Sequence, residues 1–420
     1  MKYDFSKTYN VILLFLTLYI SLAAGFFFDE NLNLGAKPDW YSGDIPVLEA
    51  FSNDLKKTFI NYDIYGHRHS PIYLIFLGFL KSIGLDFDLI RFIHLNISIL
   101  LIYFFYKCLS IKFDYIDKNI LLVFSFSILL SPTFRSLAIW PDTRIIGLLF
   151  FTISILDFLK YLKYKKKIYI WKNTFFLICS SYISPNFSLF IIFFAYHYIK
   201  ENNSRDLFFL YFFCLISSLP AFYYIFILDV NFLMVNTPGE VIGENISLSF
   251  NISDKILIIS SIILFHLTPF LLNKDFLYEI IKNLKKDFLI VSLIFLILLY
   301  FFNYQISYTG GGIFFQTSNF FFKSNILFYF ISFSSLILLF SFVKNNLNNF
   351  LIFFALILSN IQNTIYHKYY DPLMMILFFT VIAIPESLRF FNKKNNLFII
   401  YIFYILYISS RVIKNNFFSV

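Results

Sequence analysis

The sequence predicts an all-α, polytopic helical membrane protein. Of its 420 residues, 59% are hydrophobic and only 14% are charged, whereas about a quarter of the residues in a soluble domain are charged. The mean hydropathy is +0.72. The lysines behind the formal charge of +9 lie in short connectors between apolar runs. This distribution follows the positive-inside rule, so the positive charge indicates a membrane protein and not a partner of nucleic acid.

The apolar runs predict about 13 transmembrane helices in a single membrane domain over 1–420, without a separate soluble domain. A membrane-crossing helix needs about 20 mostly apolar residues. The runs are 11–28, 90–108, 118–132, 138–159, 171–184, 186–199, 207–228, 255–272, 287–303, 325–343, 349–365, 370–385 and 397–413. A further run, 71–84, is short, contains Lys81 and ends in Gly84.

The basic connectors predict the orientation. Segment 160–172 contains six lysines, and 282–287 and 389–396 are also basic, so all three are expected in the cytoplasm. If 71–84 crossed the membrane with the N-terminus inside, segment 160–172 would be forced outside. We therefore predict that 71–84 is a juxtamembrane helix, although it is apolar enough for the crossing alternative to stay open.

The first outer loop, 29–89, carries most of the functional information, because it contains nine of the 25 acidic residues. Ionisable groups at a membrane are costly and are usually functional. Within the loop, 45–59 predicts an amphipathic helix with apolar side chains at helical spacing. Asp44 precedes this helix at an N-cap position, and Pro46 lies in its first turn. The other outer segments are 131–144, 229–254, 304–325 and 365–372, so an outward-facing active site is expected.

Several short motifs follow one another in a family-like order. The first outer loop has an acid after the first span, then an amphipathic helix, and then His69-Ser70-Pro71-Ile72-Tyr73. This order resembles the first outer loop of GT-C-fold glycosyltransferases. That group includes protein O-mannosyltransferases and the aminoarabinose and lipopolysaccharide sugar transferases. Three later features resemble further motifs of this group: Gly84 with Arg91, Trp140-Pro141-Asp142, and the segment 366–372. The resemblance is strongest over 1–200. Where the family has Asp-Glu, this chain offers, in order of preference, Asp44, Asp39 and Asp29.

The resemblance implies an inverting glycosyltransferase that takes a sugar from a polyprenyl-phosphate donor. The acceptor is a lipid, a glycan or a protein, and the active site faces the periplasm or exterior of a bacterial inner membrane. A carboxylate serves as general base, so Asp44 and Asp39 are the expected catalytic residues. Positively charged side chains stabilise the negative charge that develops on the leaving phosphate. The expected substrate-binding residues are His67, Arg68, His69, Arg91, Lys368 and Tyr370. No metal, no cofactor and no nucleic acid is expected; membrane lipids are the other partners.

Two other classes of protein share a many-helix architecture. A polysaccharide polymerase usually has its main outer loop late in the chain, whereas the acidic loop is early here. A lipid-linked glycan flippase or transporter favours polar residues at midspan and related halves, whereas these spans are nearly uncharged. The main cavity distinguishes the classes: a transferase needs one near Asp44 at the outer interface, and a transporter needs one at the membrane midplane.

Overall fold

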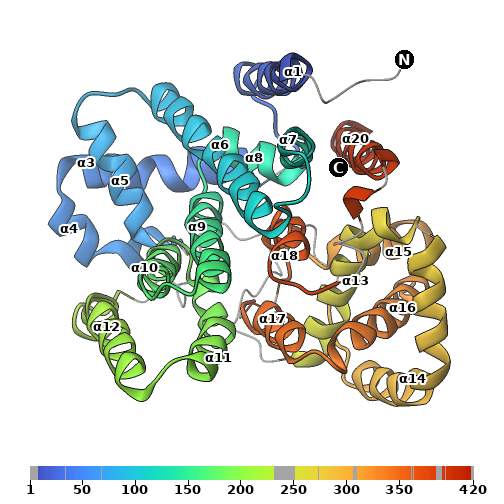
Figure 1. Ribbon diagram of the computed structural model, residues 1–420. Coiled ribbons are helices and arrows are strands. Elements are labelled where there is room, and N and C mark those ends of the chain that lie inside the picture. Colours follow the sequence, from blue (N-terminus) through green and yellow to red (C-terminus); the bar gives the residue numbers. More distant parts are fainter. Residues whose placement is uncertain are drawn as a thin grey trace. The chain divides into compact units, whose positions relative to one another are not determined.

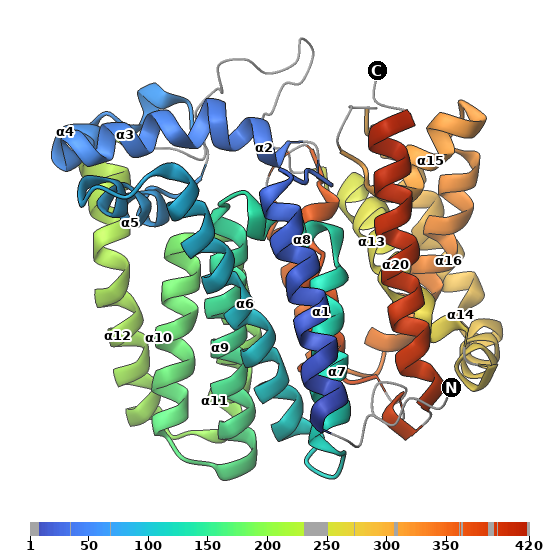
Figure 2. The same ribbon diagram turned by 90° about the horizontal axis from the view of Figure 1, so that it is seen from above.

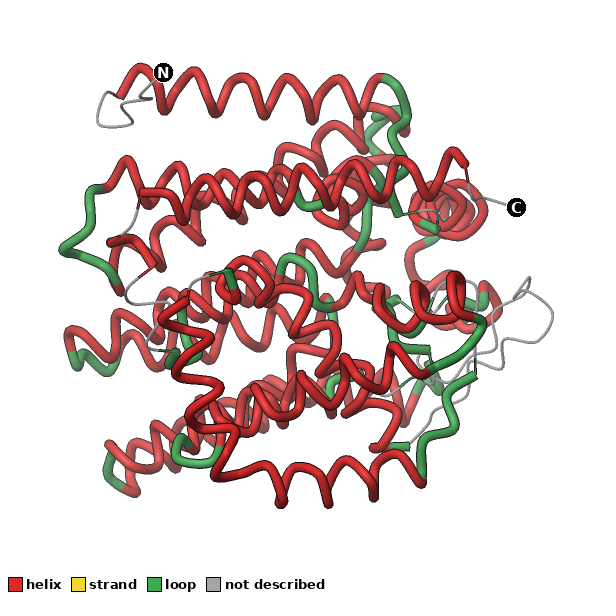
Figure 3. The backbone as a smooth tube through the Cα atoms, turned by 90° about the vertical axis from the view of Figure 1, so that its right-hand side faces the viewer, coloured by secondary structure: helices red, strands yellow, loops and turns green. Residues whose placement is uncertain are grey.

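The protein is helical throughout its described chain, as Figure 1 and Figure 3 show. The computed structural model describes residues 8–33, 35–67, 69–230, 251–272, 274–305, 310–360, 362, 364–384, 390–392 and 394–417. Within them, seven helices are long and apolar enough to cross a membrane, or eight if one bent pair is a single span. The class of helical membrane protein is therefore confirmed, while the count of 13 stays a prediction.

The chain divides into two compact units, and each is described by itself. Unit 1 comprises Met1–Gly239 and Ile400–Val420, and unit 2 comprises Glu240–Ile399. Much of the predicted outer segment 229–254, and part of 304–325, lie outside the described residues.

The long helices of unit 1 run side by side in Figure 2. Buried α9 packs against α6 and α10. One tie between helices is Asn173 on α10, whose amide donates to the Ser154 carbonyl of α9 over 2.9 Å. The bounds are α1 (Thr8–Phe27), α6 (Phe87–Lys112), α7 (Lys118–Phe126), α9 (Thr143–Tyr164), α10 (Ile168–Ile183), η4 (Pro185–Phe190), α11 (Ile191–Glu201), α12 (Ser204–Phe222) and η5 (Tyr223–Ile227). Helix α20 (Lys394–Phe417) begins in unit 2 and belongs to unit 1 from Ile400 onward.

Residues 29–89, the predicted first outer loop, contain a layer of short helices that lies across the ends of α9, α10 and α12 in Figure 2. The layer contains α2 (Ala36–Pro38), η1 (Asp39–Asp44), α3 (Ile45–Asn53), α4 (Leu55–Ile60), η2 (Tyr62–Tyr65) and α5 (Pro71–Ser82). Helix α5 packs closely on α3, since a Cβ at Gly78 would lie 2.7 Å from the Phe51 Cβ. Helix α5 is shorter than the seven candidate spans, and its juxtamembrane position stays a prediction.

The predicted amphipathic helix at 45–59 is broken at Asp54. The backbone of Asp54 is extended there (φ −152°), and its carboxylate caps α4 by accepting from the Lys57 amide. The prediction that Asp44 is an N-cap is wrong. Helical backbone already begins upstream in α2 and η1, so Asp44 has helical dihedral angles and makes no capping bond. It lies four residues from Trp40 and four from Leu48, on the buried stripe of this helix.

Segment 131–144, expected as an outer turn, contains a buried helix. Helix α7 and η3 (Ser127–Leu130) end at Ser131, which caps α8 (Pro132–Ile139). The two helical parts meet at 70°. Arg135 of α8 is only 4% exposed, and both of its bonds to the Glu30 carboxylate are 2.7 Å long. A buried charge needs such a partner.

Unit 2 contains α13 (Ile252–Leu271), α14 (Lys274–Tyr300), α15 (Gly312–Phe322), α16 (Ile326–Val343), α17 (Leu347–Leu358), η6 (His367–Tyr369), α18 (Leu373–Phe379) and η7 (Phe390–Asn392). Helix α15 lies inside the segment that was expected to be an open outer loop. It starts at Gly312, whose φ of 75° suits glycine. A Cβ there would lie 2.7 Å from the Ile262 side chain of α13, so this glycine allows α15 and α13 to pack closely.

Candidate functional site

Asp44, His67 and His69 come together in unit 1. Asp44 ends η1, and both histidines lie in the connector between η2 and α5. The Asp44 Oδ1 and His67 Nε2 atoms are 2.5 Å apart, and the two imidazole centroids are 4.8 Å apart. One ligand atom from each of the three residues lies within 4.8 Å of the others. The sequence analysis named all three residues but did not anticipate a shared ligand set, because 23 positions separate Asp44 from His67.

The connector that holds the histidines is fixed by bonds to its backbone and by close packing. The buried Tyr62 hydroxyl donates to the His69 carbonyl over 2.7 Å, and the Tyr62 ring lies 6.3 Å from the His67 ring. Ser70 donates to the Tyr182 carbonyl of α10. Gly66, with a φ of 62°, turns the chain between η2 and His67. The position of the imidazoles is therefore set by several elements of unit 1.

Asp44 and His67 change each other's proton affinity. Burial raises the pKa of Asp44 to about 6, although the attraction of His67 opposes the rise. Burial alone would lower the pKa of His67, but the charge and hydrogen bond of Asp44 raise it. The charges of Asp39 and Asp142 also raise the pKa of both groups. The two groups therefore titrate as a coupled pair, in which burial raises the pKa of Asp44 and the Asp44 charge raises the pKa of His67.

The start of α9 adds a cation to this cluster. The Asp142 carboxylate caps α9 by accepting from the Arg144 amide over 2.7 Å. The Arg144 Nη2 lies 3.4 Å from the His69 Nε2, and its Nη1 lies 3.9 Å from the Asp142 carboxylate. The Asp142–Arg144 ion pair is therefore long. The position of Arg144 beside His69 was not predicted, because 75 positions separate the two residues.

Arg91 has several partners of its own. Its guanidinium lies 3.1 Å from both Asp29 and Asp88, and Nε donates to the Ile139 carbonyl over 3.4 Å. It also stacks 3.8 Å from the Trp140 ring centroid. Arg91 is only 3% exposed, so these contacts use most of its donors.

The other acids ranked as bases lie in different surroundings. Burial acts to raise the pKa of Asp29, but its hydrogen bonds to Lys37 and Arg91 hold that pKa below its usual value. Such a carboxylate is a poorer base than Asp44. Asp39 is exposed at the start of η1. Arg68, expected to bind the donor, lies outside the described residues.

Lys368 and Tyr370 belong to unit 2. The Lys368 Nζ lies 5.4 Å from the Tyr366 ring centroid. Tyr370 is buried, and its hydroxyl donates to the Leu356 carbonyl over 3.5 Å. The neighbouring His367 ring lies 5.1 Å from that of His266 on α13. The predicted roles of Lys368 and Tyr370 in substrate binding stay predictions.

The chain matches no known family model, no curated protein and no solved structure. The arrangement of Asp44, His67, His69 and Arg144 is therefore the basis for any functional argument.

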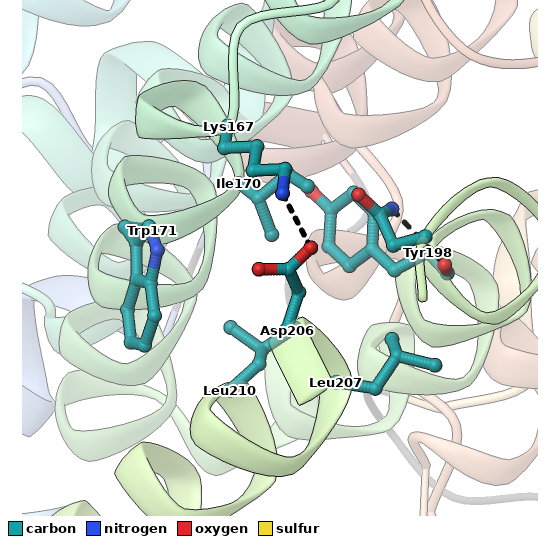
Figure 4. Close-up of a pocket in the computed structure, with 8 residues that line it drawn as sticks. Lys167, Ile170, Trp171, Tyr198, Asp206, Leu207 and Leu210 are labelled. Carbon is teal, nitrogen blue, oxygen red and sulfur yellow. Dashed lines mark hydrogen bonds and ion pairs between the residues drawn. The ribbon is translucent and has the colours of Figure 1, made fainter. Parts of the chain in front are cut away.

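A pocket elsewhere in unit 1 lies among the first turns of α10 and α12 and the end of α11 (Figure 4). Lys167 and Asp206 form an ion pair of 2.5 Å there, with Trp171 and Tyr198 among the other lining residues. Because it lies beside the six-lysine connector, it is neither of the two cavities that distinguish a transferase from a transporter. Lys163 and Lys165 of this connector pair with Asp114 and Glu201, so the connector is ion-paired and not only a solvated anchor.

Proposed function

We propose that this protein is an inverting glycosyltransferase that moves a sugar from a polyprenyl phosphate to a lipid, glycan or protein acceptor. The observation that carries the proposal is the cluster around Asp44. The buried Asp44 carboxylate contacts His67, the His67 ring lies next to the His69 ring, and Arg144 lies 3.4 Å from His69. This arrangement supplies a proton acceptor and a cation within one site, which transfer from a phosphate-linked donor requires.

Asp44 is the proposed general base. An acceptor hydroxyl attacks the anomeric carbon on the face opposite to the phosphate. A new carbon–oxygen bond forms while the bond from that carbon to the phosphate oxygen breaks, so the configuration inverts. The hydroxyl proton passes to the Asp44 carboxylate, whose pKa of about 6 is near the value at which a base is effective at neutral pH. His67 holds the carboxylate in place by the 2.5 Å contact.

The cation that meets the leaving phosphate is assigned to Arg144 in preference to Arg91. Arginine suits phosphate because its planar guanidinium offers paired donors. The Arg144 guanidinium lies at the site, 3.4 Å from the His69 Nε2, whereas Arg91 is bound by two carboxylates at 3.1 Å. Arg144 is therefore the arginine that adjoins the cluster of Asp44, His67 and His69.

The proposed side of the membrane is the outer one, with the active site facing the periplasm or exterior of a bacterial inner membrane. The crosswise layer with Asp44 and the six-lysine connector 160–172 lie at opposite ends of the unit 1 helices in Figure 2. A lysine-rich connector favours the cytoplasmic side. This geometry supports an outward-facing site, where a lipid-linked donor and its acceptor meet.

The test is sugar transfer by the purified full chain in liposomes that contain a panel of polyprenyl-phosphate sugars. We expect one donor to release free polyprenyl phosphate in step with a glycosylated acceptor, and NMR of the product to show an inverted anomeric centre. Retention of configuration, or release without an Asp44 requirement, would refute the proposed mechanism. Transport of the intact lipid-linked sugar without cleavage would favour a flippase.

A further inference from the structure

The three side chains of the site also have the composition of a transition-metal site. Two imidazoles and one carboxylate suit first-row ions such as Zn²⁺ and Co²⁺, whereas Mg²⁺ and Ca²⁺ prefer a set made only of oxygen atoms. The ligand atoms of Asp44, His67 and His69 already lie within 4.8 Å of one another. Asp44 comes from η1 and the histidines from the connector before α5, and the Tyr62 bond to the His69 backbone ties that connector to η2.

The distances need only small adjustments. With bonds of about 2.0–2.1 Å, two ligands of a tetrahedral ion are roughly 3.3 Å apart. Asp44 and His67, now 2.5 Å apart, would separate by about 1 Å, and His69 would approach by at most about 1.5 Å. These are changes that side-chain rotation supplies without moving the backbone.

The charges around the cluster also favour a cation. The carboxylates of Asp39 and Asp142 act on both Asp44 and His67, so three acids, Asp44 included, favour a positive charge at the His67 imidazole. Among the described residues, Arg144 contributes an opposing charge 3.4 Å from the His69 Nε2.

We propose that Asp44, His67 and His69 bind one divalent transition-metal ion of the Zn²⁺ class. The ion lies between Asp44, His67 and His69 and takes the place of the direct Asp44–His67 contact, and water or an anionic oxygen completes its coordination. Metal binding does not depend on the transfer reaction. Its consequence does rest on the proposed function: a carboxylate bound to the ion no longer accepts a proton, so Zn²⁺ inhibits sugar transfer.

The experiment measures Co²⁺ and Zn²⁺ binding to the metal-stripped full chain in detergent, without any sugar donor. We expect one ion per chain by calorimetry and elemental analysis, and a visible Co²⁺ spectrum with the intensity of a low-coordinate site. Asp44→Asn, His67→Gln and His69→Gln should each weaken binding by about a hundredfold or more, since even groups behind metal ligands change affinity by about 10–100-fold.

The matched control is His197→Gln. His197 is on α11 and packs against Phe158 and Phe193, so its loss should leave the Co²⁺ spectrum unchanged. Zn²⁺ should also raise the melting temperature of the wild type and the control, but not of the ligand variants. Two histidine variants are used separately, so that misfolding of one leaves the other informative. Absence of saturable binding, or equal binding by all three ligand variants, would overturn the metal site.

The result on metal binding and the result on transfer are independent. Stoichiometric binding in a protein that transfers no sugar would support the metal site and refute the proposed function. Full transfer activity with the site saturated by Zn²⁺ would keep the metal site and exclude Asp44 as the base.

Discussion

Asp44 shows how one buried carboxylate combines structural and chemical roles. It lies on the buried stripe of a continuous helical segment and faces His67 instead of capping a helix. The loss of its charge therefore changes a side-chain pair and leaves the helix start intact. This distinction separates the predicted effects on catalysis from effects on folding.

Asp44→Asn should abolish most transfer while leaving expression normal. Asparagine keeps the size of the side chain but does not accept the acceptor's proton, and loss of a general base typically costs about 10²–10⁴-fold in rate. Initial rates with saturating donor measure the effect. Asp39→Asn and Asp29→Asn are the matched controls and should retain transfer. If Asp39→Asn alone were inactive, the base would be Asp39.

Transfer should rise with pH through about 6, the pKa of Asp44, and fall about tenfold per pH unit below it. The stability should change in the opposite direction. The pKa values of Asp44 and His67 in the folded state are both above their ordinary values, so the folded protein binds more protons than the unfolded chain. The contribution of Asp44 to stability is therefore full below its ordinary pKa of 3.8 and is lost as pH rises through about 6. The contribution of His67 is lost at higher pH, above its ordinary pKa of 6.5. Measurements of transfer rate and of melting temperature against pH test both predicted directions. In Asp44→Asn, neither quantity should change with pH through about 6.

Arg144→Ala should reduce use of the lipid-phosphate donor ten- to hundredfold, because a charge-assisted contact is worth about 1.5–3 kcal/mol. Its melting temperature should change little. Arg91→Ala is the comparison, and it should mainly lower the melting temperature, since it removes contacts to Asp29, Asp88 and Trp140. If Arg91→Ala lost affinity for the donor while its stability was unchanged, Arg91 and not Arg144 would be the residue that binds the leaving phosphate.

At the scale of elements, the Glu30–Arg135 pair joins the end of α1 to α8. Arg135→Leu should destabilise the protein by about 3 kcal/mol, at the lower end of the range for breaking a buried pair, because the Glu30 side chain is 23% exposed. Thermal unfolding in detergent measures this. The double variant with Glu30→Gln should recover part of the loss, whereas equal loss in both variants would show that packing, and not charge, dominates.

The sequence predicted individual elements better than their contacts. Periodicity and composition located α1, α6, α9 and α13 within a few residues, and short motifs named Asp44, His67 and His69. The break at Asp54 was missed because the apolar spacing continues across it. The partners of Arg91 and Arg135 were missed because such contacts join positions far apart in the chain, 62 and 105 residues away for Asp29 and Glu30, and local patterns do not encode them.

At the scale of the whole molecule, the topology makes a direct prediction about sidedness. In a variant with Cys108, Cys179 and Cys214 replaced by alanine, a cysteine at Ser42 should react with an impermeant maleimide in intact spheroplasts. A cysteine at Tyr164 should react only after the membrane is opened. Both positions are exposed, so a difference in labelling reports the side of the membrane. The reverse pattern would invert the orientation and remove the outward-facing site.

The buried contact between Glu30 and Arg135 has a consequence for how the chain is made. Glu30 is synthesised 105 positions before Arg135, and Gly25 leaves room for both charges, since a Cβ there would lie 2.8 Å from the Glu30 carboxylate. An unpaired charge is expensive among apolar neighbours. The Glu30–Arg135 pair can therefore form only after α8 (Pro132–Ile139) has been synthesised, so the loop that follows α1 is made before its charge partner exists.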